Sequence, residues 1–244
     1  MSYKPLPFNQ YFIDVSQGLG GETSVDFEYK KITYLHHKHE HYAYYKVLYN
    51  AARDCIQIFF KETTDDTGWA ANFDFAEDYY DSFDFGGKNI QLKVHNGWNI
   101  MYRAMKHYIR DDFGEAVKEY ISAHGLTASL PTVEIIGWSL GSGQAQLCAQ
   151  DLFFNFGYKP IVITFGSVKP WYKTNDDMVE YLTYCYKECY NFCDVNDIVT
   201  YMPPFPKYFM LHKKSVAQDK FNIFRLFKPG KYHTEYYKDL YGKE

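Results

Sequence analysis

The chain has 244 residues, a formal net charge of −4 and a pI of about 6.1, and aromatic residues make up 20% of it. This charge gives no case for nucleic-acid binding, and the length suits one α/β domain over residues 1–244. The N-terminus lacks the pattern of a signal peptide, and no stretch approaches the ~20 apolar residues that a spanning helix needs. With five cysteines, an odd number, we expect reduced thiols and a cytoplasmic protein, leaving non-classical export open.

The first half of the chain predicts a hairpin, a strand and a long helix. Residues 46–50 and 55–61 are rich in apolar and aromatic side chains and flank the sequence Ala-Ala-Arg-Asp, which is typical of a hairpin. Residues 89–95 have the composition of a strand, and residues 99–122 follow with a helical pattern.

Strands alternate with helices from residue 89 onward, which predicts the α/β class with a mostly parallel sheet covered by helices. The expected strands are 132–137, 160–166 and 189–193, and the expected helices begin after Ser139 and cover 176–184 and 233–241.

The sequence Gly137-Trp-Ser-Leu-Gly141 has the spacing of a nucleophile elbow, Gly-x-Ser-x-Gly. In such a turn the serine hydroxyl projects above the end of the sheet, and chain and helix pass so close that only small residues fit two positions before and after it. A strand-like run precedes the turn and a helical pattern follows it. We therefore interpret Ser139 as a nucleophile; the alternative is a structural glycine-rich turn.

A serine nucleophile needs a base, and the base needs an orienting acid. Asp197 follows a predicted strand in a loop that ends in two prolines, which suits the acid, and Asp194 is its competitor. The base follows the acid in chain order in hydrolases of this kind, which leaves His212 and His233.

The sequence contains two clusters of metal-ligating residue types. Histidines at alternate positions could face one way on a strand, but we favour a polar surface segment, and three cysteines four residues apart lack an obvious fourth zinc ligand. We therefore expect no metal. The clusters are His36, His37, His39 and His41, and Cys185, Cys189 and Cys193.

Five motifs in a fixed order carry a family resemblance, from about Lys46 to the C-terminus. They are IQIFFKETTDDTGWAANF, VHNGW, GWSLGSGQA, ITFGSVKP and NDIVTYMPP. The chain resembles the class 3 lipases, the α/β-hydrolases that include filamentous-fungal triacylglycerol lipases. The resemblance implies an α/β-hydrolase fold, with a mostly parallel central sheet flanked by helices and a lid-like loop over the site.

The resemblance also implies roles for particular residues. Ser139 is the nucleophile and Asp197 the acid, while His233 matches the family's late His-x-x-Tyr histidine before the last helix, which favours it over His212. Thr63 and Leu140 supply the oxyanion hole, the group of donors that stabilises the developing negative charge. The expected lid and acyl groove contain Trp69, Phe73, Phe75 and Trp138.

Three departures from the family pattern stand near these positions. Lys61-Glu62 replaces Arg-Gly before the oxyanion residue, Trp138 replaces a histidine, and Ser142 replaces a glycine. Glu62 brings a carboxylate close to where negative charge must develop.

We expect a serine carboxylic-ester hydrolase that cleaves acylglycerols or similar lipid esters through an acyl-enzyme, without metal or organic cofactor. The alternatives are an sn-1 phospholipase and a non-catalytic hydrolase-like scaffold that binds lipid or protein. The expected partner is a lipid or other ester substrate, with no nucleic acid. Residues 62–87, acidic and aromatic, form the expected lid, and the basic segment 204–232 leaves peripheral membrane contact open.

Overall fold

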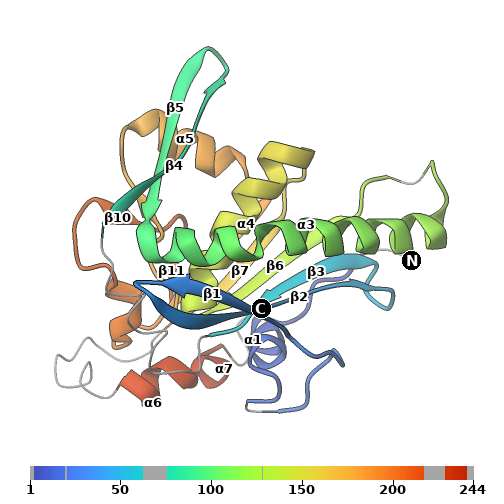
Figure 1. The fold of residues 1–244 in the computed structure, drawn as a ribbon. Coiled ribbons are helices and arrows are strands. Elements are labelled where there is room, and N and C mark those ends of the chain that lie inside the picture. Colours follow the sequence, from blue (N-terminus) through green and yellow to red (C-terminus); the bar gives the residue numbers. More distant parts are fainter. Residues whose placement is uncertain (1–2, 20, 63–75, 128, 217–228, 241–244) are drawn as a thin grey trace.

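The computed structural model describes residues 3–19, 21–62, 76–127, 129–216 and 229–240. A central seven-stranded sheet has the order β1-β2-β3-β6-β7-β9-β11 (Figure 1). From β3 to β11 the neighbouring strands are parallel, and β1 and β2 add an antiparallel hairpin beside β3. The strands are β1 (Lys30–His36), β2 (His39–Asn50), β3 (Cys55–Phe60), β6 (Thr132–Trp138), β7 (Ile161–Phe165), β9 (Glu188–Cys193) and β11 (Lys213–Ser215).

The middle strands consist mostly of apolar residues because helices cover both faces of the sheet. β3 and β7 are buried along their whole length, and β6 is buried from its second residue onward. Continuous apolar runs are the signature of parallel strands in this position. Because β6 lies between β3 and β7, its C-terminal end, which leads into Ser139, is at the centre of one sheet edge.

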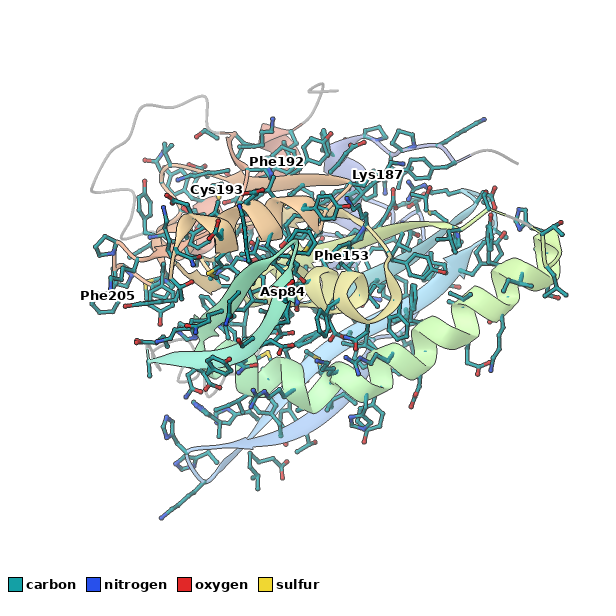
Figure 2. All side chains as sticks on the ribbon, turned by 90° about the horizontal axis from the view of Figure 1, so that it is seen from above. Asp84, Phe153, Lys187, Phe192, Cys193 and Phe205 are labelled. Carbon is teal, nitrogen blue, oxygen red and sulfur yellow. The ribbon has the colours of Figure 1, made fainter. Side chains whose placement is uncertain are left out.

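The helices form a layer on each face of the sheet (Figure 1). α3 (Asn96–His124), α4 (Leu140–Phe156) and α5 (Asp176–Tyr184) cover one face, and α3 and α4 pack side by side with their side chains filling the space between them (Figure 2). α1 (Phe8–Ser16), α6 (Pro229–Thr234) and α7 (Tyr236–Asp239) lie on the other face. A separate hydrophobic core lies between each helix layer and the sheet.

A second, antiparallel sheet corrects the expected topology. Residues 89–95 do form a strand, but it pairs in a four-stranded sheet of order β10-β8-β5-β4, outside the parallel sheet. Its partner β4 arises from the segment expected to belong to the lid, because aromatic residues alternate along it and pack on the core. The strands are β4 (Glu77–Phe85), β5 (Lys88–His95), β8 (Trp171–Tyr172) and β10 (Tyr208–Phe209).

Other expectations divide between confirmed and wrong. The hairpin of β2 and β3 and helix α5 form as predicted. The expected C-terminal helix is instead two short helices, and His233 lies in the last turn of α6. The expected polar surface segment is wrong for His36 and His41, whose side chains are buried where β1 and β2 pair. Within the described ranges, no helix is long and apolar enough to cross a bilayer.

Candidate active site

Ser139 occupies the sharp turn between β6 and α4. Its φ of 56° and ψ of −125° lie outside the regions that a non-glycine residue ordinarily adopts. Its backbone N–H donates to the carbonyl of Phe165 at 2.9 Å, which ties the turn to the end of β7. Strained backbone of this kind persists only where its surroundings hold it, and it concentrates at functional sites.

Close backbone approach explains both glycines of the Gly-x-Ser-x-Gly motif. A Cβ atom on Gly137 would lie 2.5 Å from the carbonyl oxygen of Gly141. A Cβ on Gly141 would lie 2.2 Å from the carbonyl oxygen of Phe60 and 2.8 Å from that of Lys61. These obstacles are backbone atoms that cannot move aside. The end of β3 therefore passes directly against the turn that holds Ser139, as the sequence pattern predicts.

Asp197 lies in the loop after β9 and caps a 3-10 helix, η1 (Ile198–Tyr201), by accepting the N–H of Val199 at 3.0 Å through Oδ1. Its other oxygen, Oδ2, accepts from Nδ1 of His233 and from the hydroxyl of Tyr236, both at 2.8 Å. The side chain is fully buried. Asp194, the competitor, instead accepts the N–H of Asn196 at 2.7 Å through Oδ1.

His233 is held on several sides. Its ring stacks on Trp138 with centroids 5.7 Å apart, and its carbonyl accepts the indole N–H of Trp138 at 3.1 Å. Gly166, at φ 56°, lies beneath the ring, because a Cβ there would be 2.6 Å from Cε1 of the imidazole. Nε2 is buried and has no hydrogen-bond partner among the described residues, so the structure contains no hydrogen bond between His233 and Ser139.

His212 lies apart from this arrangement. It is exposed, just before β11, and its backbone carbonyl accepts the N–H of Asn191 at 3.4 Å. Of the two candidate bases, the structure therefore brings only His233 to Asp197.

Two carboxylates act on the imidazole of His233. Burial works to lower its pKa, but the charge and hydrogen bond of Asp197, together with the charge of Glu62, outweigh burial, so the pKa lies above its ordinary value. Burial in turn raises the pKa of Glu62, against the charges of His233 and Lys61. Burial and the Asp197 charge raise the pKa of Tyr236 well above its usual range, which keeps its hydroxyl a neutral donor to Asp197.

The remaining expected residues fall into two groups. Leu140 is the first residue of α4, so its N–H belongs to the helix terminus that lacks intrahelical acceptors and favours negative charge. Trp138 is buried against His233, and its role in an acyl groove stays a prediction. The others lie outside the described residues: Thr63, Trp69, Phe73 and Phe75.

Among the residues that the structure describes, no three histidine, cysteine or acidic side chains are arranged to hold a metal ion. Cys185, Cys189 and Cys193 are free thiols buried in the core, and burial raises the pKa of each to about 12. They therefore remain protonated at neutral pH.

Two residues of the site were not singled out from the sequence. The signal for Tyr236 was present, because it is the tyrosine of the His-x-x-Tyr pattern that begins at His233. Gly166 ends the ITFG motif, and a glycine after a strand suggests close backbone approach without naming what approaches.

Residues 57–207, more than half of the chain, match the family model described as Lipase (class 3). Three similar solved structures are a Rhizomucor miehei lipase propeptide complex, a fungal lipase–inhibitor complex, and a triacylglycerol lipase whose catalytic centre is described as a serine protease triad. Each is 21% identical to this chain, with TM-scores of 0.55, 0.59 and 0.56. No curated protein matches the chain.

The shared portions differ in extent. The similarity covers 77%, 86% and 78% of this chain, and 57%, 76% and 67% of the respective lipases. The chain thus spans little more than half of the Rhizomucor miehei chain. At this level of identity the structural similarity establishes the α/β-hydrolase fold.

Proposed function

The chain belongs to the class 3 lipase family, and from that premise we propose that it is a serine carboxylic-ester hydrolase acting on acylglycerols or similar lipid esters. One observation carries the proposal: the buried hydrogen bond between Asp197 and His233 lies at the sheet edge where the strained turn presents Ser139. Phe165 accepts the N–H of Ser139, and the next residue, Gly166, lies under the imidazole of His233, so a single strand end joins the two halves of the site.

In the proposed reaction, Ser139 Oγ attacks the ester carbonyl carbon and its proton passes to Nε2 of His233. Asp197 holds the proton on Nδ1, which leaves the Nε2 lone pair free to act as the base. The imidazolium then protonates the leaving alcohol, and the resulting acyl-enzyme is hydrolysed by water with His233 again acting as base. Such chemistry needs no metal ion.

Charge develops on the carbonyl oxygen in the tetrahedral intermediate. The backbone N–H of Leu140, at the positive end of α4, is one proposed donor to that oxygen. Thr63 is the second donor by family resemblance.

The Ser139–His233 hydrogen bond has to form for this reaction to proceed. Catalytic hydrogen bonds are often long in the free enzyme and tighten when substrate binds. The buried, unengaged Nε2 of His233 suits that step, because a buried polar atom gains most from acquiring a partner. We propose that the bond forms as the ester enters.

A second function, a non-catalytic scaffold that binds lipid or protein, is favoured by Glu62. The negative charge of Glu62 acts on His233. Glu62 also follows Phe60 and Lys61, whose carbonyl oxygens lie against Gly141 of the turn that holds Ser139. A carboxylate close to the developing oxyanion opposes charge formation there.

Active-site labelling distinguishes the two functions. The folded wild-type protein is treated with a fluorophosphonate probe, with the Ser139→Ala variant as the control. Labelling of the wild type but not of the variant supports the enzyme, whereas an unlabelled, folded wild type supports the non-catalytic scaffold.

A series of p-nitrophenyl esters from acetate to palmitate then gives the acyl-chain preference, and phospholipid substrates test sn-1 cleavage.

A further inference from the structure

The hydroxyl of Ser142 connects two parts of the candidate site that come from different elements. Ser142 lies in the first turn of α4, where the class 3 pattern has a glycine, and it is fully buried. Its Oγ donates to the carbonyl oxygen of Ser139 and accepts the backbone N–H of Val168 at 3.0 Å. A serine hydroxyl has one proton and two lone pairs, so both bonds form at once.

The first of these bonds is ordinary and the second is not. Serine side chains in helices often bond back to a carbonyl three or four residues earlier. The bond from Val168 reaches α4 from the segment that follows β7. Val168 also packs on the same turn of α4, because a Cβ on Gly143 would lie 3.1 Å from its Cγ2 atom. The segment after β7 is therefore fixed to the helix by a polar and an apolar contact.

The same segment supports the proposed base. Gly166, two residues before Val168, touches the imidazole of His233, and a Cβ there would also come within 3.1 Å of Oδ2 of Asp197. Residues 166–168 therefore contact the imidazole at one end and the hydroxyl of Ser142 at the other, and that hydroxyl also bonds to the carbonyl of Ser139. Three residues of chain carry both contacts, so a shift at one end is transmitted to the other.

We propose that Ser142 is a positioning residue, whose hydroxyl fixes the backbone of Ser139 relative to the segment on which His233 and Asp197 rest. The inference rests on the proposed hydrolase function and deepens it. Ser139 and His233 are not hydrogen-bonded to each other in the structure, so their separation is set by the backbone that carries them. Small errors in such a distance have large effects on rate.

The test compares Ser142→Ala with Ser142→Thr, which keeps the hydroxyl, and with Thr164→Val as a matched control. Thr164 is also fully buried, and its hydroxyl bonds to Asn191 of the neighbouring strand β9 instead of to the elbow. We expect Ser142→Ala to lower kcat and the rate of fluorophosphonate labelling per folded molecule by roughly tenfold or more, with KM unchanged. Ser142→Thr should restore most of the rate, while Thr164→Val should lower thermal stability and leave kcat of the folded fraction unchanged.

Each outcome decides a separate point. If the wild type is labelled and Ser142→Ala reacts as fast, the positioning role is wrong and the hydrolase stands. If Thr164→Val loses as much kcat as Ser142→Ala, the loss reflects general loosening of the fold, and the positioning role of Ser142 is also wrong. An unlabelled wild type rejects the hydrolase, and the positioning role with it. Should Ser142→Ala fail to fold, Ser142→Gly, the residue of the family pattern, gives the same comparison.

Discussion

Nδ1 of His233 lies 2.8 Å from Oδ2 of Asp197, and the backbone N–H of Val199 occupies the other oxygen of that carboxylate. In Asp197→Asn, an amide NH2 group can replace Oδ2 and face Nδ1 of His233. The amide then stabilises the tautomer of His233 that carries its proton on Nε2, which cannot act as the base. If the proposed triad operates, we expect kcat to fall by roughly 10⁴-fold, as the same change does in serine proteases, with the fold retained.

Hydrolysis of a p-nitrophenyl ester by Asp197→Asn, with circular dichroism as the check on folding, measures this loss. Asp194→Asn is the control, because Asp194 is a buried acid of the same loop that accepts a backbone N–H instead of the imidazole. Equal activity in the wild type and Asp197→Asn would remove Asp197 from the mechanism.

The two histidines should differ sharply. His233→Ala removes the proposed base and should lower kcat by several orders of magnitude, because members of a triad act as a unit. His212→Ala removes an exposed side chain and should leave kcat close to that of the wild type. Acylation rates of both variants are compared at equal folded concentration. Loss of acylation in His212→Ala, with His233→Ala still active, would reverse the assignment.

Gly141→Ala tests the close approach of β3 to the turn. The added Cβ would meet the carbonyl of Phe60 at 2.2 Å, so either the turn or β3 has to move. We expect destabilisation of about 1–3 kcal/mol and a large loss of labelling at Ser139. Gly114→Ala, in the middle of α3 with nothing within 4 Å of its added Cβ, should raise stability by up to about 1 kcal/mol. Denaturant unfolding of both variants measures the two effects.

Much of the candidate site could be located from the sequence because its residues lie at strand ends in local motifs. The elbow needs glycines at fixed positions, and Asp197 follows a strand, so both are recognisable within a few residues. The choice of His233 over His212 used the family pattern, because the contact with Asp197 spans 36 residues of chain. Ser142 departs from the family pattern, but its role cannot be predicted from the sequence, since its partner Val168 comes from another element.

The errors in the fold have a common cause. β5 and the strands of the parallel sheet have the same local composition, and only the pairing with β4 separates them. His36 and His41 were expected on a polar surface because composition does not report which face of a hairpin meets a helix. Tertiary pairing decides both cases.

The buried ion pair between Glu134 and Arg53 should contribute to the stability of the fold. Glu134, in β6, is fully buried and accepts two bonds of 2.7 Å from the Arg53 guanidinium. Arg53→Met leaves that carboxylate without its charge partner, and we expect a loss of about 3–5 kcal/mol in the free energy of unfolding. Adding Glu134→Gln should recover part of the loss, because a buried amide costs less than a buried charge.

Urea unfolding measures both of these variants. Lys30→Met is the matched control, since the Lys30–Asp112 ion pair is much more exposed than the Arg53–Glu134 pair and should contribute about 1 kcal/mol or less. A loss in Arg53→Met no larger than that in Lys30→Met would contradict the assignment of a buried ion pair.

The Glu62 carboxylate makes the pH dependence of the reaction testable. The base must be neutral to accept the serine proton, so activity rises as pH passes upward through the pKa of His233. Asp197 and Glu62 together place that pKa above its ordinary value, and Glu62→Gln removes one of the two charges while keeping the shape. The acid limb of the kcat/KM profile should therefore move to lower pH in Glu62→Gln, and the variant should be more active than the wild type on the acidic side.

Profiles measured between about pH 5 and 9 cover this transition. Glu188→Gln is the control, because Glu188 is an exposed carboxyl at the N-terminal end of β9, opposite the end that leads to Asp197. An unmoved acid limb would mean that the Glu62 charge does not reach the imidazole. A higher plateau at alkaline pH as well would mean that Glu62 also opposes the developing oxyanion, which is how a carboxylate at this position would restrain a hydrolase.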